Sequence, residues 1–180
     1  HDSDDYRRIV ERIRDARPDI ALSSDFIVGF PGETNRDFAD TLRLISDIGY
    51  AQAYSFKYSA RPGTPAAEED GHVREAVKED RLATLQQLLK EQQLAFNEAC
   101  RGASMPVLFD RRGRRPGQLA GRTGYLQSVH AEAPDRLIGA VVDCDIVDIH
   151  PTSLKGVGDI GLPGNPDNIE CVSETERAIA

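Results

Sequence analysis

The chain has 180 residues, 39% of them hydrophobic, and a net charge of −8, so it has the composition of a globular protein with room for one ordinary domain or two small ones. The negative charge argues against indiscriminate nucleic-acid binding, and no apolar run approaches the length of a membrane span. Because the three cysteines form no disulfide framework and no charged-then-apolar leader opens the sequence, we expect a protein of the reducing cytoplasm.

The first part of the chain predicts helices that alternate with strands. Apolar residues at helical spacing predict a helix over residues 4–17, and residues 20–28 predict a buried strand. Thr34 predicts the cap of a second helix, which ends at Gly49. Residues 52–58 predict a second strand. This order predicts a parallel, right-handed α/β arrangement in which the strand before the first helix is missing.

A loop and a long helix follow. Residues 59–71 are rich in Pro and Gly and predict a segment without regular structure, whereas residues 73–100 predict a single amphipathic helix. Gln92 interrupts the apolar stripe of this helix, so we expect the helix to pack on the α/β part and not to form a coiled coil. The stripe consists of Leu82, Leu85, Leu89 and Phe96.

From Met105 the apolar period changes to that of short β segments separated by turn residues. These segments predict a small antiparallel barrel, and we place them at residues 107–109, 118–120, 126–129 and 137–149. The polar tail from Val157 predicts a disordered segment or a loose strap.

Two predicted strands run straight into Gly/Pro turns, where ligand sites form in parallel α/β folds. The first block is Asp25-Phe26-Ile27-Val28-Gly29-Phe30-Pro31-Gly32-Glu33-Thr34, and the second is Phe56-Lys57-Tyr58-Ser59-Ala60-Arg61-Pro62-Gly63-Thr64-Pro65. We expect Gly29 to let the backbone approach a ligand, and Val28 and Phe30 to offer apolar surface to a flat heterocycle. Arg61 could clamp a phosphate or carboxylate. The alternatives are that the first block is only a well-formed turn and that Arg61 is an ordinary surface arginine.

Although the whole chain is acidic, one segment of its second half is strongly basic. Six arginines and the single acid Asp110 lie between Arg101 and Arg122. Four of the arginines flank Gly113, so we expect several guanidinium groups to project from one loop and to neutralise RNA phosphates. A solvated turn is the alternative. The four histidines are far apart in sequence, and we expect no catalytic role for them.

The two strand-end blocks together resemble the end of the radical S-adenosylmethionine (SAM) barrel in bacterial tRNA methylthiotransferases of the MiaB type. Gly121-Arg122-Thr123 and Ser153-Leu154-Lys155-Gly156 resemble the RNA-binding TRAM module. His130-Ala131 departs from the family pattern, which has an apolar-aromatic pair there. The basic loop Ala60-Arg61-Pro62 resembles the branch of the family that modifies tRNA.

The resemblance implies an α/β fold followed by an all-β one. Residues 1–72 would be the last strands and helices of a radical SAM partial (β/α) barrel, 73–101 a connecting helix, 102–156 a small antiparallel TRAM-type β-barrel, and 157–180 a tail. The implied cofactor contacts are Val28, Gly29, Phe30, Phe56, Lys57 and Tyr58. The implied substrate or RNA contacts are Arg61, Arg111, Arg112, Arg114, Arg115, Arg122 and Lys155.

In the intact enzyme, as the resemblance implies, SAM and two 4Fe-4S clusters add a methylthio group to C2 of isopentenyladenosine next to the tRNA anticodon. Cys100, Cys144 and Cys171 form no CxxxCxxC triplet, so we expect a missing amino-terminal part to hold the cluster ligands and this chain alone to be inactive, with no metal ligand or catalytic residue. The expected partners are that part and the tRNA anticodon stem-loop. A threonylcarbamoyl-adenosine tRNA or a ribosomal protein is the alternative substrate. A non-catalytic RNA-binding module is the alternative outside the enzyme class.

Overall fold

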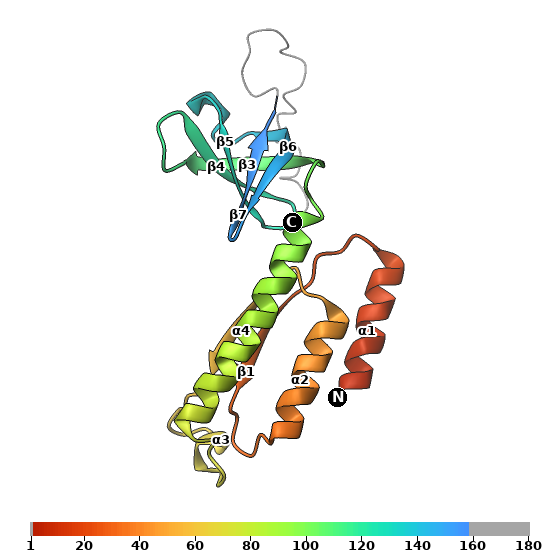
Figure 1. The fold of residues 1–180 in the computed structure, drawn as a ribbon, viewed down its shortest axis with the longest axis vertical. Helices are drawn as coiled ribbons and strands as arrows, with labels where there is room; N and C mark the ends of the chain where they lie inside the picture. The colour runs from red at the N-terminus through yellow and green to blue at the C-terminus, as the bar shows by residue number, and fades with distance from the viewer. Residues whose placement is uncertain (1, 159–180) are drawn as a thin grey trace, which may run out of the picture. The chain divides into compact units, whose positions relative to one another are not determined.

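The computed structural model describes residues 2–158, so the predicted tail beyond Gly158, with Cys171, and the terminal His1 lie outside the described residues. The chain divides into two compact units, with the boundary between Phe96 and Asn97 (Figure 1). Among the described residues, no helix is both long and apolar enough to cross a membrane. An α/β region is followed by a closed barrel, as the sequence predicts.

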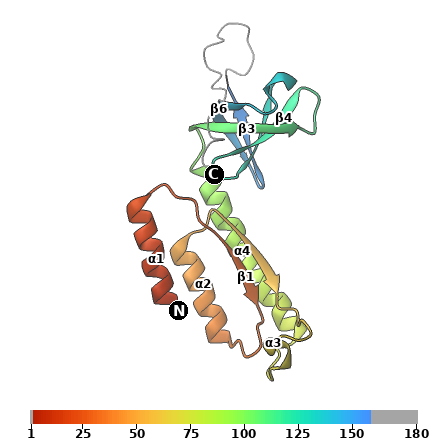
Figure 2. The same cartoon turned by 180° about the vertical axis from the view of Figure 1, so that it is seen from behind.

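The first unit is a two-stranded parallel sheet with helices on one face (Figures 1 and 2). Its elements are α1 (Ser3–Ala16), β1 (Ser23–Val28), α2 (Asn35–Ile48), β2 (Gln52–Lys57), α3 (Pro65–Glu68) and α4 (Glu75–Glu98). The strands pair in parallel from Ser23 beside Gln52 to Val28 beside Lys57, which confirms the predicted parallel pairing. The buried core joins the sheet to α1, α2 and α4 through Val10, Val28, Ile45, Ile48, Leu85 and Leu89.

Local signals of the sequence explain most of these boundaries. Thr34 caps α2 through a reciprocal capping box with Asp37, and Gly49 ends the helix with a left-handed φ of 64°. Gln92 interrupts the stripe of α4 for a structural reason. Its amide donates to the carbonyl of Ile45 at 2.8 Å and accepts from the N–H of Tyr50 at 3.1 Å, which satisfies backbone groups at the end of α2.

Two predictions for this unit are wrong. Strand β1 begins at Ser23 and alternates between exposed and covered residues, because helices cover only one face of the sheet. The loop 59–71 is not wholly irregular, because Pro65 begins the one-turn helix α3.

The second unit is a barrel of five strands within the described residues, closed in the order β3-β4-β5-β7-β6. The elements are β3 (Ser104–Arg112), β4 (Gln118–Thr123), β5 (Ser128–Glu132), the 3₁₀ turn η1 (Asp135–Leu137), β6 (Val141–His150) and β7 (Ser153–Val157). The core holds fully buried side chains from every strand: Phe109, Leu119, Val129, Ile146 and Leu154.

The prediction of a wholly antiparallel barrel is wrong in one pairing. Strand β7 lies between β5 and β6, and it runs parallel to β5 because a turn reverses the chain directly after β6. Two predicted segments also begin too early. Leu126 lies in a turn with a φ of 62°, and Leu137 belongs to η1.

Candidate nucleic-acid interface and strand-end site

The turn after β1 is held in place by helix α4. Gly29 has a φ of 74°, and a side chain there would meet Cγ of Lys78 at 2.4 Å. The Glu33 carboxylate accepts a hydrogen bond from the N–H of Gly29 at 2.6 Å and another from Arg81 at 2.6 Å. The turn therefore has a fixed geometry that a side chain at Gly29 would disturb.

Arg81 is the centre of this arrangement, and the sequence analysis did not identify it. Its guanidinium also donates to the backbone carbonyl of Glu33 at 3.1 Å and to the side-chain oxygen of Asn35 at 2.9 Å, and lies 5.5 Å from the ring centroid of Phe38. The Arg81 and Glu33 side chains are only 6% and 10% exposed. The sequence signal that could have identified Arg81 is its position, because a charged residue stands there one helical turn before Leu85 of the apolar stripe.

At the end of β2, Tyr58 lies among other rings and a cation. Its ring centroid is 5.2 Å from that of Phe30 and 6.1 Å from that of His72, and Nζ of Lys78 lies 5.8 Å from it. The hydroxyl of Tyr58 is buried and has no hydrogen-bond partner among residues 2–158. The structure thus brings the two predicted strand ends together at Phe30 and Tyr58.

The predicted cofactor residues divide between the two faces of the sheet. Val28 is fully buried against the helices, so the prediction that its side chain offers surface to a ligand is wrong. Lys57 forms ion pairs with Glu75 and Glu79 of α4. The opposite face is apolar and open instead, with Ile27 55%, Tyr54 55% and Phe56 53% exposed. Backbone contacts from Gly29, Phe56, Lys57 and Tyr58 to a cofactor stay predictions.

The residues at the two strand ends fit one of the two implied kinds of cofactor. The unpartnered Tyr58 hydroxyl and the nearby exposed ring of Phe30 suit a ligand that carries a flat heterocycle with polar edges. Cys144 does not suit an iron–sulfur cluster, because it is buried in the barrel core, where burial raises its pKa to about 11. Within the described part of the chain, no group of three His, Cys, Asp or Glu side chains could hold a metal ion.

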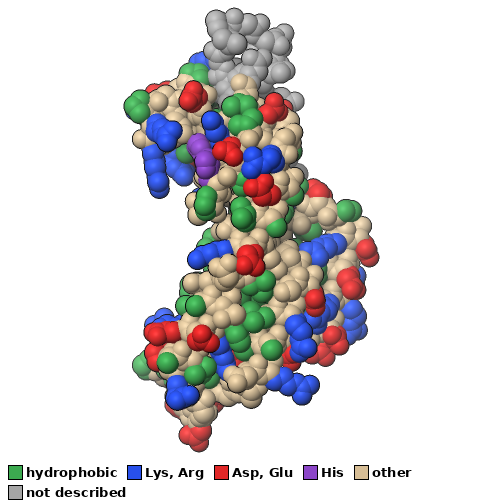
Figure 3. Space-filling model, in the orientation of Figure 1, with side chains coloured by type: hydrophobic (Ala, Val, Ile, Leu, Met, Phe, Trp, Pro, Cys, Tyr) green, Lys and Arg blue, Asp and Glu red, His purple; other side chains and the backbone are tan. Residues whose placement is uncertain are grey.

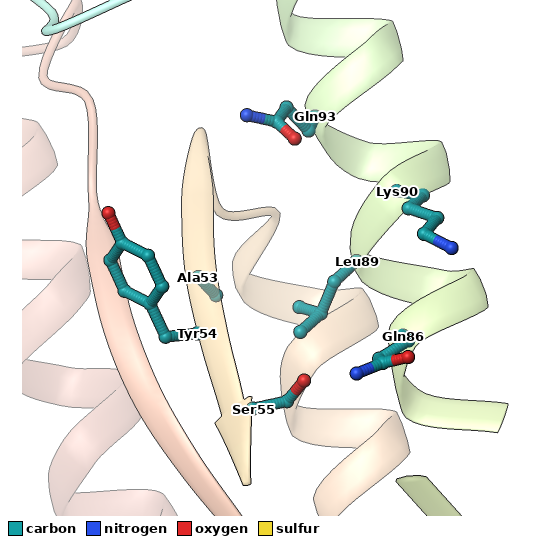
Figure 4. A pocket seen from close by; sticks show the side chains of 7 residues that line it. All are labelled: Ala53, Tyr54, Ser55, Gln86, Leu89, Lys90 and Gln93. Atoms are coloured by element: carbon teal, nitrogen blue, oxygen red, sulfur yellow. The ribbon is translucent and has the colours of Figure 1, made fainter. Parts of the chain in front are cut away.

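A groove of about 320 Å³ lies between β2 and α4. Figure 4 shows Ser55 and Gln86 lying toward one another across it and Leu89 directed toward β2, whereas Tyr54 points away from α4. None of the residues predicted as site residues lines this groove. Arg61 lies elsewhere, in the exposed loop after β2, where its carbonyl accepts hydrogen bonds from the N–H and hydroxyl of Thr64 at 3.2 and 2.8 Å.

In the barrel, the hairpin between β3 and β4 brings four predicted arginines together, but they differ in their partners. Arg111 pairs with Asp110 at 2.7 Å, and Arg112 donates twice to one carboxylate oxygen of Asp135, at 3.1 and 2.6 Å. Arg114 and Arg115 are exposed and form no ion pair with any of residues 2–158. The second pair is therefore the one available to an anionic ligand.

Arg122 and Lys155, two of the implied RNA contacts, both lie on strands of the barrel. Arg122 lies on β4, where it donates to the carbonyl of Leu126 at 3.0 Å, and Lys155 lies on β7. Side chains alternate along a strand, so Leu154 enters the core while Lys155 stays on the outer surface. The two cations thus lie on the outer wall of the barrel.

Two histidines that are far apart in the sequence also meet on this wall. The rings of His130 on β5 and His150 on β6 are stacked, with centroids 5.1 Å apart and planes at 29°. Burial, then the charges of His150, Lys155 and Arg115, lowers the pKa of His130, while Asp148 opposes the shift. Figure 3 shows histidine beside a group of Lys and Arg side chains on this face of the barrel.

Comparison with known protein families supports the assignment of the barrel. Residues 98–157 match the family model of the TRAM domain. The match confirms the TRAM part of the predicted resemblance, and it indicates RNA binding because TRAM is an RNA-binding module. It covers the second compact unit up to the end of β7.

Proposed function

We propose that this chain binds folded RNA through exposed basic side chains of its TRAM barrel, and that it is the tRNA-contacting part of a radical SAM methylthiotransferase. One observation carries the RNA proposal. Arg114, Arg115 and Lys155 are exposed on a TRAM barrel and form no ion pair within residues 2–158, in a chain with a net charge of −8. Unpaired cations held on a rigid barrel can displace counterions from RNA phosphates.

The test compares two double variants with the same change in charge. Replacing Arg114 and Arg115 by Ala is expected to weaken binding of the full chain to a tRNA anticodon stem-loop. It should also flatten the salt dependence by about 0.9 in log–log slope for each phosphate that the variant no longer neutralises, on the scale of a duplex. Replacing Arg111 and Arg112 by Ala should have a smaller effect, because those guanidinium groups already pair with Asp110 and Asp135. Binding is titrated at several salt concentrations.

The decrease in affinity should be similar for stem-loops that differ in loop sequence, because phosphate contacts position the RNA without reading bases. Circular dichroism establishes that both variants are folded. If the folded Arg114/Arg115 variant keeps its affinity and its salt slope, the hairpin is a solvated surface and the proposed RNA contact is wrong.

The enzyme part of the proposal has support from the first unit. The parallel strands β1 and β2 end side by side, and their open face carries Ile27, Tyr54 and Phe56 opposite the helix-covered face. In the proposed enzyme this face lines the inside of a larger barrel, and the Gly29 turn and Tyr58 lie beside SAM. SAM when bound would supply a radical and a methyl group, and this chain would orient the cofactor and the tRNA. The proposed substrate is C2 of isopentenyladenosine next to the anticodon, with both 4Fe-4S clusters held by an amino-terminal part.

Two alternatives differ from this proposal in observable ways. A threonylcarbamoyl-adenosine tRNA or a ribosomal protein as substrate would change the product that mass spectrometry detects after reaction of the longer protein. A non-catalytic RNA-binding module would lack a CxxxCxxC triplet in its upstream coding sequence. Reading that coding sequence is the first experiment, because absence of the triplet would contradict the enzyme proposal and leave RNA binding intact.

The open sheet face yields a further prediction about the isolated chain. At high concentration we expect self-association, because Ile27 and Phe56 leave an apolar face uncovered and β2 pairs only with β1 among the described strands. Replacing both residues by Ser should shift sedimentation velocity profiles toward the monomer. The control is Leu108→Ser, an exposed apolar residue of the barrel, which should leave the profile unchanged. A wild-type chain that stays monomeric at all concentrations would contradict the prediction.

A further inference from the structure

We propose that His130 and His150, together with Lys155 and Arg115, form a binding site for a phosphate group of RNA on the outer wall of the barrel. The inference rests on the proposed RNA binding, and it adds two residues for which the sequence analysis expected no such role. It predicts that RNA binding by this chain strengthens as His130 becomes protonated.

The strand register puts these groups in one place. His130 on β5 pairs with Lys155 on β7, and Lys155 pairs on its other side with Asp148 of β6. His150 pairs with Ser153 of β7, two residues before Lys155. The two rings meet across β7, where their centroids lie 5.1 Å apart. The pairing order of the strands, and not their order in sequence, therefore creates the site.

The charges around the pair favour an anion. Lys155 and Arg115 act on His130 from β7 and from the hairpin before β4, and both oppose its protonation. Asp148 favours protonation of His130, and Arg101 already binds the carboxylate of Asp148 at 3.3 Å. A phosphate would add a negative charge beside these groups and would favour the imidazolium form, which donates from both ring nitrogens.

The sign of the pH effect follows directly. Phosphodiesters stay ionised between pH 5.5 and 8, whereas an ordinary histidine takes up a proton in this range. Because the free site disfavours a charged His130, binding of a phosphate should be accompanied by proton uptake. Affinity should therefore rise as the pH falls.

The experiment measures binding of the full chain to a tRNA anticodon stem-loop at pH 8 and pH 5.5, at constant ionic strength. The wild-type affinity is expected to rise by about tenfold toward pH 5.5, as an added cationic contact from His130 would give. The double variant His130→Phe/His150→Phe keeps two stacked rings but cannot be protonated, and it should lose most of this rise. His72→Phe removes a histidine from the other unit and should keep the rise. If the Phe variant fails to fold, the His130→Gln/His150→Gln variant replaces it.

The outcomes separate the two proposals. If RNA binds, loses affinity in the Arg114/Arg115 variant, and shows the same pH dependence in wild type and His double variant, the histidine site is wrong and the proposed function stands. If the double variant binds weakly at both pH values but keeps the tenfold rise, protonation of these two histidines is not the source of the rise, which also overturns the phosphate site. Absence of RNA binding at either pH overturns both proposals.

Discussion

Replacing Arg81 by Met is expected to lower the free energy of unfolding of the first unit by about 3–5 kcal/mol, the cost of breaking a buried ion pair from one side. The variant would leave the Glu33 carboxylate, which is 10% exposed, with the N–H of Gly29 as its remaining described donor. It would also remove the donor to Asn35 and the cation above Phe38. This decrease is a large part of the stability of a typical domain. Chemical denaturation monitored by hydrogen exchange mass spectrometry can assign it to residues before the unit boundary.

Two controls show whether the buried charge is responsible. The double variant Glu33→Gln/Arg81→Met removes both charges and should recover part of the stability, because no uncompensated carboxylate remains. Arg43→Ala removes an arginine from an exposed ion pair with Asp40 and should cost less than about 1 kcal/mol. If Arg81→Met costs no more than Arg43→Ala, the turn after β1 does not depend on Arg81.

Replacing Gly121 by Ala is expected to destabilise the barrel by about 3 kcal/mol, at the upper end of the usual cost of overpacking. A Cβ at this position of β4 would lie 2.3 Å from the carbonyl oxygen of Leu108 and 2.9 Å from Cα of Phe109. Both atoms belong to the backbone of β3, next to the irregularity between Phe109 and Arg111, so no side chain can move aside. The closed barrel must open at the β3–β4 pairing to admit the methyl group.

Gly124→Ala is the matched control for this variant. A Cβ at Gly124, in the turn after the same strand, would meet no atom within 4 Å, and the change should shift stability by about 0.5 kcal/mol or less. Thermal unfolding of the two variants, with hydrogen exchange followed over residues 104–157, compares them directly. Equal melting behaviour would show that β3 and β4 tolerate separation at Gly121. Loss of RNA binding by Gly121→Ala alone would link barrel closure to the proposed function.

The sequence predicted the elements well wherever a local signal determines them. The capping box at Thr34 and the left-handed Gly49 are read from adjacent residues, and the parallel pairing follows from the alternation of helix and strand. The exposed face of β1 was missed because its sequence, with Phe26, Ile27 and Val28 in succession, is apolar on both sides. An apolar run does not reveal which alternate residues the helices will cover.

The site residues that were missed depend on contacts between distant segments. Arg81 and Glu33 are 48 residues apart, and their pairing follows only from the packing of α4 on the strand-end turn. His130 and His150 meet because β7 inserts between β5 and β6, an order that the alternation of residues does not encode. The clustering of Arg114 and Arg115, by contrast, was predictable because a single hairpin holds both.

The position of β7 in the barrel sets the moment at which this unit can be completed during protein synthesis. A nascent chain that has emerged from the ribosome as far as Pro151 can form the sheet β6-β3-β4-β5, but both outer strands of that sheet still lack a neighbour. When residues 153–157 emerge as well, strand β7 pairs with both outer strands, places Leu154 in the core and brings Lys155 beside His130. Closure of the barrel and assembly of the proposed phosphate site are then one event, so a chain released before Ser153 would lack both.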